Sequence, residues 1–252
     1  MKQDTSMSGQ VAVVTGGGGG IGSAICRRLA AAGAKVVLTY RKSREKTEAV
    51  ANSLAGEGHL VRQAPVNDSA AMKRLADEVA ERYQRLDLLV NNAGITRPVP
   101  HDDLESLDDE IIDHIFQVNW RGAFASVRAF RHLLEQGEGG TVVNISSVAA
   151  VTGIGSNVAY CASKAAMDSM TRSLARALAP KIRIVSVSPG WVMGEYARRM
   201  PPEVIQTQKD KTPLARIAEA EDVADAVWAV STTLTFSTGC IIPVDGGRPL
   251  GV

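Results

Sequence analysis

The sequence predicts an α/β fold: a single-domain, doubly wound parallel sheet with helices on both faces, in three layers (α/β/α). Short runs rich in β-branched residues alternate with longer segments of helical periodicity, a pattern typical of βαβ units. A run of five glycines follows the first apolar run and opens the first helical segment. No internal repeat or low-complexity linker divides the 252 residues, so we expect one domain over residues 1–252.

Each element is predicted from its local pattern. Strands are predicted at Val11–Thr15, Lys35–Tyr40, Leu60–Ala64, Leu86–Asn91, Thr141–Ser146, Ile182–Ser188 and Cys240–Val244. Helices are predicted at Ile21–Ala32, Arg44–Ala55, Ser69–Tyr83, Leu107–Leu134, Val158–Leu178 and Ala220–Val230. A glycine at position 33 ends the first helix. Residues 191–213 lack a strand signal and contain two adjacent prolines, so we expect an inserted helical lid there.

Composition excludes several classes of function. The formal net charge is +1 and the basic residues are scattered, which argues against a nucleic-acid or anionic-membrane partner. No apolar stretch approaches the roughly 20 residues of a membrane span. The polar N-terminus lacks the apolar core of a secretory signal, and the three cysteines lie far apart. We therefore expect a soluble, cytoplasmic protein.

The sequence lacks the residue patterns that a metal site and a serine hydrolase would need. The four histidines show no His-x-x-x-His pair and no nearby cysteine partner, so we expect no metal site. No Gly-x-Ser-x-Gly occurs, which leaves a hydrolase of the nucleophile-elbow type without its serine.

The glycine run at residues 15–22 (Thr-Gly-Gly-Gly-Gly-Gly-Ile-Gly) predicts a phosphate site. Glycine lets the backbone approach a pyrophosphate, and free N–H groups at the start of a helix face the anion. A flexible linker is the alternative. The apolar strand before the run and the helical face of Ile21, Ile25 and Leu29 after it favour the phosphate site.

Tyr160 and Lys164 stand four residues apart, which on a helix places both side chains on one face. A lysine ammonium beside the tyrosine would lower the phenol pKa from about 10. Bringing it near 7 requires roughly 4 kcal/mol, so a second positive charge, such as an oxidised nicotinamide, is needed. A tyrosine tuned in this way is a general acid–base. An ordinary surface Tyr and Lys are the alternative.

A series of motifs resembles the short-chain dehydrogenase/reductase family over almost the whole chain. The motifs are Val11–Gly16, Asn91–Gly94, Val143–Ser147, Tyr160 with Lys164, Ser188–Gly190 and Val244–Gly247. The resemblance implies a Rossmann fold, and a nicotinamide-dependent oxidoreductase acting on a ketone or secondary alcohol. The cofactor-binding residues that it implies are Gly16, Gly19, Gly20, Ile21, Tyr40, Arg41, Val66, Asn91, Ala93, Gly94, Tyr160, Lys164, Pro189, Gly190 and Val192.

The same resemblance implies four catalytic residues. Tyr160 exchanges the proton, and Lys164 lowers the tyrosine pKa and anchors the ribose. Ser147 orients the substrate oxygen; Ser146 is its rival, but only Ser147 has the thirteen-residue spacing to the tyrosine. Asn119 holds a relay water through its backbone, although a solvated or capping asparagine is the alternative.

The end of the second predicted strand decides the cofactor. An NAD enzyme needs a carboxylate there for the ribose hydroxyls, but Tyr40 stands at that position. Arg41 follows, and a guanidinium can grip a 2′-phosphate with two hydrogen bonds. NADP(H) is therefore expected over NAD. A solvated basic turn of Arg41, Lys42 and Arg44 is the alternative.

The sequence indicates the substrate and the partners less specifically than it indicates the cofactor. The resemblance is strongest to 3-oxoacyl-[acyl-carrier-protein] reductase-like members, which suggests a ketone or an acyl thioester. The acidic loop at residues 135–140 opposes an acidic acyl carrier protein, so free and carrier-bound substrates rank level. Apolar residues in segments 107–134 and 158–178 suggest a homotetramer. A dinucleotide-sensing protein without turnover is the competing function.

Overall fold

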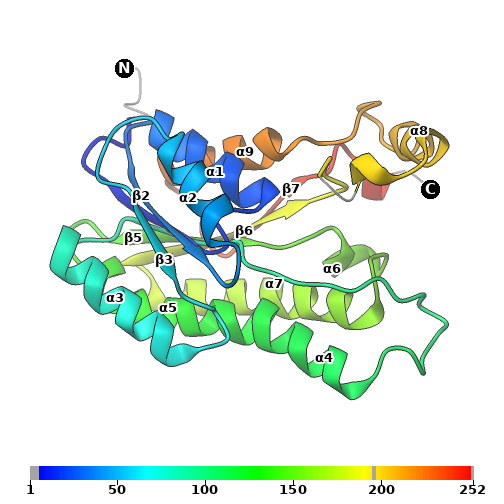
Figure 1. Ribbon diagram of the computed structural model, residues 1–252, viewed down its shortest axis with the longest axis horizontal. Coiled ribbons are helices and arrows are strands. Elements are labelled where there is room, and N and C mark those ends of the chain that lie inside the picture. The colour runs from blue at the N-terminus through cyan, green and yellow to red at the C-terminus, as the bar shows by residue number, and fades with distance from the viewer. Residues whose placement is uncertain (1–5, 195–196, 251–252) are drawn as a thin grey trace.

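A computed structural model of the chain describes residues 6–194 and 197–250. Within these residues the core is a seven-stranded parallel sheet in the order β3-β2-β1-β4-β5-β6-β7 (Figure 1). The strands are β1 Val11–Val14, β2 Lys35–Tyr40, β3 Leu60–Gln63, β4 Leu88–Asn91, β5 Gly140–Ile145, β6 Ile182–Pro189 and β7 Ile241–Val244. The order reverses between β1 and β4, where a doubly wound sheet opens a crevice at the carboxyl ends of its strands. The predicted fold class is confirmed.

Helices cover both faces of the sheet, as Figure 1 shows. α1 (Gly20–Ala31), α2 (Arg44–Asn52) and α9 (Ala220–Thr232) form one layer. α3 (Ser69–Tyr83), α4 (Asp109–Phe116), α5 (Gly122–Leu134) and α7 (Val158–Leu178) form the other. No helix in the described ranges has the length and hydropathy of a membrane span.

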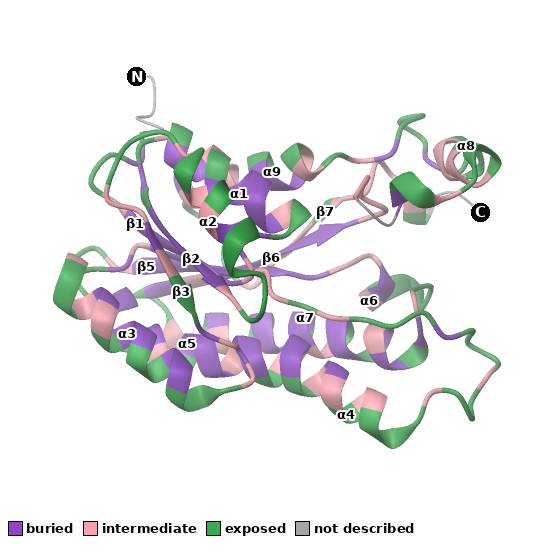
Figure 2. Cartoon of the chain, in the orientation of Figure 1, coloured by how far each residue is buried: buried purple, intermediate pink, exposed green. Residues whose placement is uncertain are grey.

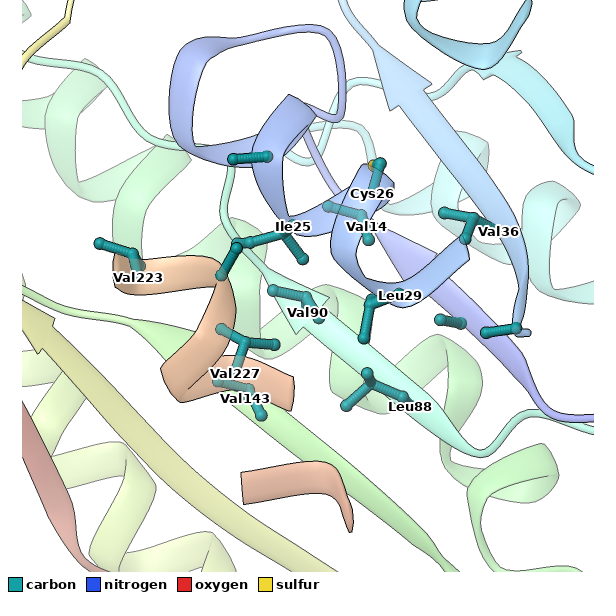
Figure 3. Packing of buried hydrophobic residues seen from close by; sticks show 14 of the residues in the cluster. Val14, Ile25, Cys26, Leu29, Val36, Leu88, Val90, Val143, Val223 and Val227 are labelled. Carbon is teal, nitrogen blue, oxygen red and sulfur yellow. The ribbon is translucent and has the colours of Figure 1, made fainter. Parts of the chain in front are cut away.

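Alternate residues of the central strands enter different apolar layers. Ala12 and Val14 of β1 pack beneath α1 and α9, whereas Val11 and Val13 face α3 and α5. Figure 3 shows Ile25 and Leu29 of α1 directed toward the sheet. Both faces are buried along the middle of the sheet (Figure 2), which is why its strands read as continuous apolar runs.

The long helix predicted over residues 107–134 is wrong in its start and its regularity. It begins at Asp109, where the Asp108 carboxylate caps it by accepting the N–H of Ile111 at 2.8 Å. A π-turn, η1 (Gln117–Arg121), then separates α4 from α5. Such turns widen a helix locally and are frequent at functional sites. The turn contains Asn119, a residue type with low helix propensity in the middle of a helical segment.

Among the other predicted elements, the ranges of β2, α3 and α7 are confirmed at both ends and the remaining boundaries shift by at most three residues. Two helices were not predicted individually. α6 (Ala149–Thr152) is too short to show a periodic signal. α8 (Pro202–Asp210) lies in the region expected to be helical, begins with proline at its first position and has no buried residue. A short 3₁₀ turn, η2 (Ala197–Arg199), precedes it. Figure 1 shows α8 standing away from the sheet, near the C-terminal end of the chain.

Candidate active site

In the turn between β1 and α1, the backbone at the start of the helix lies close to the backbone at the end of the strand. Gly16 has a positive φ of 69°, which glycine adopts without strain. A Cβ at Gly22 would lie 2.3 Å from the Gly16 carbonyl oxygen and 2.7 Å from the amide nitrogen of Asn92. Asn92 donates to the carbonyls of Thr15 and Gly16 at 2.9 and 3.2 Å. The glycines thus let α1 start directly above the turn, and Asn92 fixes the turn to the end of β4.

A cavity of about 270 Å³ lies beside this turn, at the carboxyl ends of β1, β2 and β4; we call it the Arg41 cavity. Seven of the predicted cofactor-binding residues line it: Gly16, Gly19, Tyr40, Arg41, Val66, Ala93 and Gly94. The Arg41 guanidinium lies 3.5 Å from a ring nitrogen of His114, and no carboxylate of the described chain forms a salt bridge with it. Neighbouring Arg44 differs, because it pairs with Glu48 at 2.8 Å.

A second cavity of about 270 Å³, the Lys164 cavity, continues from the first one. Asn92, Gly94 and Ile95 line both cavities. The predicted residues that line the second cavity are Ile21, Gly94, Ser147, Tyr160, Lys164, Pro189, Gly190 and Val192. The structure therefore joins residues that are separated by more than 150 positions in the sequence.

The start of α7 positions Tyr160. Asn157 caps this helix, and its side-chain oxygen accepts the Tyr160 backbone N–H at 2.6 Å. The amide nitrogen of Asn157 donates to the Arg97 carbonyl at 2.7 Å, which ties the loop after β4 to the helix. Lys164 lies one turn later, with its ammonium nitrogen 5.7 Å from the centre of the Tyr160 ring.

The two pKa values move in the directions that burial imposes. Burial raises the pKa of the Tyr160 phenol above its ordinary value, and the hydrogen bond with Ser147 offsets only part of this rise. Burial also lowers the pKa of the Lys164 ammonium to about 8, against the opposing pull of the Asp168 carboxylate. The expected lowering of the tyrosine pKa by Lys164 is therefore not a property of the protein groups alone.

Ser147 and Ser146 have different surroundings. Ser147 lines the Lys164 cavity together with Tyr160, whereas the Ser146 hydroxyl, although it borders the same cavity, is buried and lies 3.5 Å from the Lys164 carbonyl. The geometry favours Ser147 as the serine that meets a substrate oxygen.

Asn119 is fully buried and lines neither cavity. Its side-chain oxygen accepts the N–H of Ile95 at 2.8 Å. Its amide nitrogen donates to the Ile95 carbonyl and to the Ser163 hydroxyl, both at 3.0 Å. The side chain thus joins the loop after β4 to α7 between Tyr160 and Lys164, and the π-turn brings it there.

Two predicted cofactor residues lie outside both cavities. Asn91 points into the sheet, where its amide nitrogen donates to Asn144 at 2.8 Å, and Asn144 donates to Thr171 of α7 at the same distance. Asn91 is therefore a brace of the sheet, and its neighbour Asn92 reaches the cavities instead. Gly20, the first residue of α1, lines neither cavity, although the space beside it is open.

A third and larger cavity, of about 710 Å³, shares Thr96, Ser147, Tyr160 and Gly190 with the Lys164 cavity. Its remaining lining comes from the loop after β4, from the segment around α6, and from Trp191, Met200, Gln208 and Arg248; we call it the Arg248 cavity. Trp191, Met200 and Gln208 belong to the predicted lid segment, but no motif marked them individually, and Arg248 lies outside every predicted element.

The first two cavities fit a nicotinamide dinucleotide. Joined by their three shared lining residues, they form one trough along the carboxyl ends of the strands, from the Arg41 guanidinium, past a glycine turn at a helix N-terminus, to Tyr160 and Lys164. A side chain at Gly20 would meet no other part of the described chain within 4 Å, so packing does not require glycine there. No cluster of three or more His, Cys, Asp or Glu residues in the described parts could hold a metal ion.

Comparisons with known proteins agree with this geometry. The family model described as enoyl-(acyl carrier protein) reductase matches residues 16–248. The chain is 37% identical to granaticin polyketide synthase ketoacyl reductase 2 of Streptomyces violaceoruber, over 95% of this chain and 96% of that protein. It is 35% identical to cis-4-hydroxycyclohexanecarboxylate dehydrogenase of Sinomonas cyclohexanicum, over 94% and 96%. A glucose/ribitol-dehydrogenase-type structure from Brucella melitensis superimposes with a TM-score of 0.89 at 30% identity, over 98% and 99%.

Proposed function

Because the chain belongs to the short-chain dehydrogenase/reductase family, we propose that this oxidoreductase uses NADP(H) to interconvert a ketone or 3-oxoacyl group and a secondary alcohol. One observation carries the proposal: Ser147 and Tyr160 stand where the trough that fits the dinucleotide meets the Arg248 cavity. A carbonyl in that cavity would lie against both hydroxyl groups.

Each residue of the site has a role that its position supports. When bound, the nicotinamide supplies or accepts the hydride. The Tyr160 hydroxyl gives its proton to the carbonyl oxygen during reduction and takes it back during oxidation. Ser147 donates a hydrogen bond to the same oxygen and holds it near the tyrosine. Asn119, through Ile95 and Ser163, keeps the loop and the helix at the spacing that the chemistry needs.

The pKa directions support different protonation states of Tyr160 in the reductive and oxidative directions. At neutral pH Tyr160 holds its proton, because burial raises its pKa. This favours proton donation in the reductive direction. In the oxidative direction the phenol must lose its proton, and we expect its pKa to fall only when an oxidised nicotinamide adds a positive charge beside the ring. Lys164, next to Tyr160 in the same cavity, would bind the ribose hydroxyls.

The preference for NADP(H) rests on the Arg41 cavity. Tyr40 and Arg41 line it without an acidic residue, and Arg41 has no carboxylate partner among the described residues. A 2′-phosphate would supply that partner, and a carboxylate that repels it is missing.

The relatives support a carbonyl or alcohol substrate, since their names give a ketoacyl group and a hydroxycyclohexanecarboxylate. We propose that the described part of residues 191–213, with η2 and α8, closes over this substrate as a lid; residues 195 and 196 of the predicted lid lie outside the described residues. The acidic loop before β5 remains an argument against tight docking of an acidic carrier protein.

We also propose a cytoplasmic homotetramer paired through α5 and α7. Of the apolar residues predicted to lie at that interface, two are partly exposed, Ala166 and Leu174, and five are buried within the subunit itself: Val118, Ala123, Ala125, Met167 and Met170. Trp120, Phe124 and Leu174 pack on this cluster and stay partly exposed. Their remaining apolar surface is what a partner helix would cover.

The experiment that tests this function is a turnover assay of the purified protein. NADPH and NADH are each supplied with acyclic ketones, cyclic ketones and 3-oxoacyl thioesters, and the loss of reduced-cofactor absorbance is measured. Turnover of at least one carbonyl class is expected. Tight NADPH binding with no turnover on any of them would instead indicate a dinucleotide-sensing protein.

A further inference from the structure

The Arg248 cavity contains a cation that the proposed chemistry does not use. Among the described residues that line this cavity, Arg248 is the only charged one. The others are apolar or neutral polar, and they include Ser147, Tyr160, Trp191, Met200 and Gln208. The cavity therefore pairs an apolar wall with one positive charge, in the same space as Tyr160.

The local sequence places Arg248 there. After β7 the chain turns through Gly246 and Gly247, whose φ angles are 65° and 83°. The Asp245 carboxylate accepts the N–H of Gly247 at 2.8 Å and stabilises the turn. A side chain at Gly246 would meet Thr212 at 2.6 Å, so glycine also permits the turn to pack under the lid segment. The chain then points back toward α8, as Figure 1 shows for the C-terminal end.

The guanidinium of Arg248 is half-buried, and its hydrogen bonds go to neutral acceptors. It donates to the backbone carbonyl of Gln208 at 3.4 Å and to the side-chain oxygen of the same residue. It forms no salt bridge with a carboxylate in the part of the chain that the structure describes. Gln208 holds the guanidinium in place without neutralising it, and a guanidinium has five N–H donors, so some remain for a ligand.

The segment of residues 197–211, beside Arg248, also has more basic than acidic side chains. Residues 197–211 contain four basic side chains, Arg198, Arg199, Lys209 and Lys211, and two acidic ones, Glu203 and Asp210. Arg198 forms a salt bridge with Glu219 at 3.4 Å, so the net positive charge of this segment is small and favours the approach of an anion only weakly.

We propose that Arg248 determines specificity by binding a carboxylate of the substrate, so that the enzyme acts on oxo acids or hydroxy acids whose reacting carbon and carboxylate are joined by an apolar skeleton. The inference rests on the proposed function and narrows its substrate class. The carbonyl lies at Ser147 and Tyr160, the skeleton lies against Trp191 and Met200, and the carboxylate receives two parallel hydrogen bonds from Arg248. A neutral ester of the same compound would leave the guanidinium without its anion.

The test compares oxo acids of increasing chain length with their methyl esters, using kcat/KM in wild type and variants. Wild type is expected to prefer one of the acids over its ester by about 10- to 100-fold, the scale of a hydrogen bond to a charged group. R248Q should abolish this preference by lowering kcat/KM for the acid while the ester changes little. Equal loss for acid and ester would show that Arg248 only supports the structure, and would overturn the proposal.

Two further variants sharpen the result. Q208E keeps Arg248 but places a carboxylate beside it, so the acid preference should fall as it does in R248Q. Arg199 is the matched control, because it is exposed on the same lid and does not line the cavity. R199Q removes the same charge and should keep the acid preference within about 2-fold.

Binding measurements separate this inference from the proposed function. Hexanoate and methyl hexanoate are titrated against the protein, and quenching of Trp191 fluorescence is measured with W191F as the signal control. Tighter binding of hexanoate, lost in R248Q, would support the inference even if no ketone were turned over. Equal binding of both compounds would refute it whatever the turnover assay gives. So would preferred turnover of the neutral N-acetylcysteamine thioester of 3-oxobutanoate with no effect of R248Q, which would place Arg248 outside substrate recognition.

Discussion

The ammonium nitrogen of Lys164 donates a hydrogen bond to the backbone carbonyl of Ile145 at 2.7 Å, deep inside the molecule. This contact joins α7 to the last residue of β5, directly before Ser146 and Ser147. Lys164 and Asp168 are the only buried charged residues in the described chain. Burying the charged lysine therefore lowers the stability of the fold, in addition to any catalytic role that we propose for it. The effect on stability can be measured by itself, because it depends on pH.

We predict that Lys164→Met changes stability in a pH-dependent way. The pKa of Lys164 is lowered to about 8 by burial, while the unfolded chain keeps the ordinary higher value. Between these two values the unfolded state binds more protons, so wild type gains stability as pH rises through 8. The variant lacks this gain. From pH 7 to pH 9.5 the stability of wild type relative to the variant should increase by about 2 kcal/mol.

Urea unfolding of both proteins at the two pH values measures this difference. The groups far from Lys164 are the same in both proteins, so their contributions cancel in the comparison. A constant difference would mean that Lys164 is not held in a low-polarity environment.

The second prediction concerns the proton donor. Tyr160→Phe removes only the hydroxyl, so cofactor binding should persist while turnover falls by at least ~10²-fold. NADPH fluorescence measures binding and the ketone assay measures turnover. Near-normal turnover in this variant would exclude Tyr160 as the acid–base.

The third prediction concerns cofactor choice. Arg41→Ala should raise KM for NADPH about 10-fold or more, because a charge-assisted contact to the 2′-phosphate is lost, and should leave KM for NADH nearly unchanged. Arg44→Ala is the control, since Arg44 is already paired with Glu48. A wild-type enzyme that prefers NADH would refute the proposed NADP(H) preference.

The fourth prediction separates two glycines of the same turn. Gly22→Ala should destabilise the protein by about 1–3 kcal/mol, because its methyl group would collide with the Gly16 carbonyl. Gly20→Ala should keep full stability, because the space around Gly20 is open, yet weaken NADPH binding by filling that space. Thermal unfolding and NADPH titration of both variants give the result. A Gly20→Ala protein with normal affinity would mean that the dinucleotide does not pass over this residue.

The fifth prediction concerns assembly. Light scattering at micromolar concentration should give a tetramer, and Phe124→Glu should lower its mass by placing a charge on the exposed apolar face of α5. Ala49→Glu, at an exposed position of α2 in the opposite layer, adds the same single negative charge and should leave the mass unaltered. A monomeric wild-type protein would contradict the proposed pairing of α5 and α7.

Much of the fold could be predicted because its signals are local. A β1 strand that is buried on both faces must be an unbroken apolar run, and a glycine turn that opens a helix must carry its glycines in order. The spacing of Ser147, Tyr160 and Lys164 is likewise visible in one dimension, since a strand end and one helix hold all three. The long helix over residues 107–134 was predicted wrongly where contacts distant in sequence determine the backbone. The Asn119 side chain forms hydrogen bonds with Ile95 and Ser163, and a π-turn interrupts the helix at that point.

The sequence alone therefore determined the family, the doubly wound sheet and the residues proposed to carry the chemistry, because each depends on short spacings within a strand, a turn or a helix. Only the tertiary structure decided that Asn92 rather than Asn91 reaches the trough, that burial raises the pKa of Tyr160, and that Arg248 shares a cavity with it. These properties depend on what surrounds a side chain. Residues separated by nearly ninety positions become neighbours only when the sheet, the lid segment and the C-terminal turn are packed together.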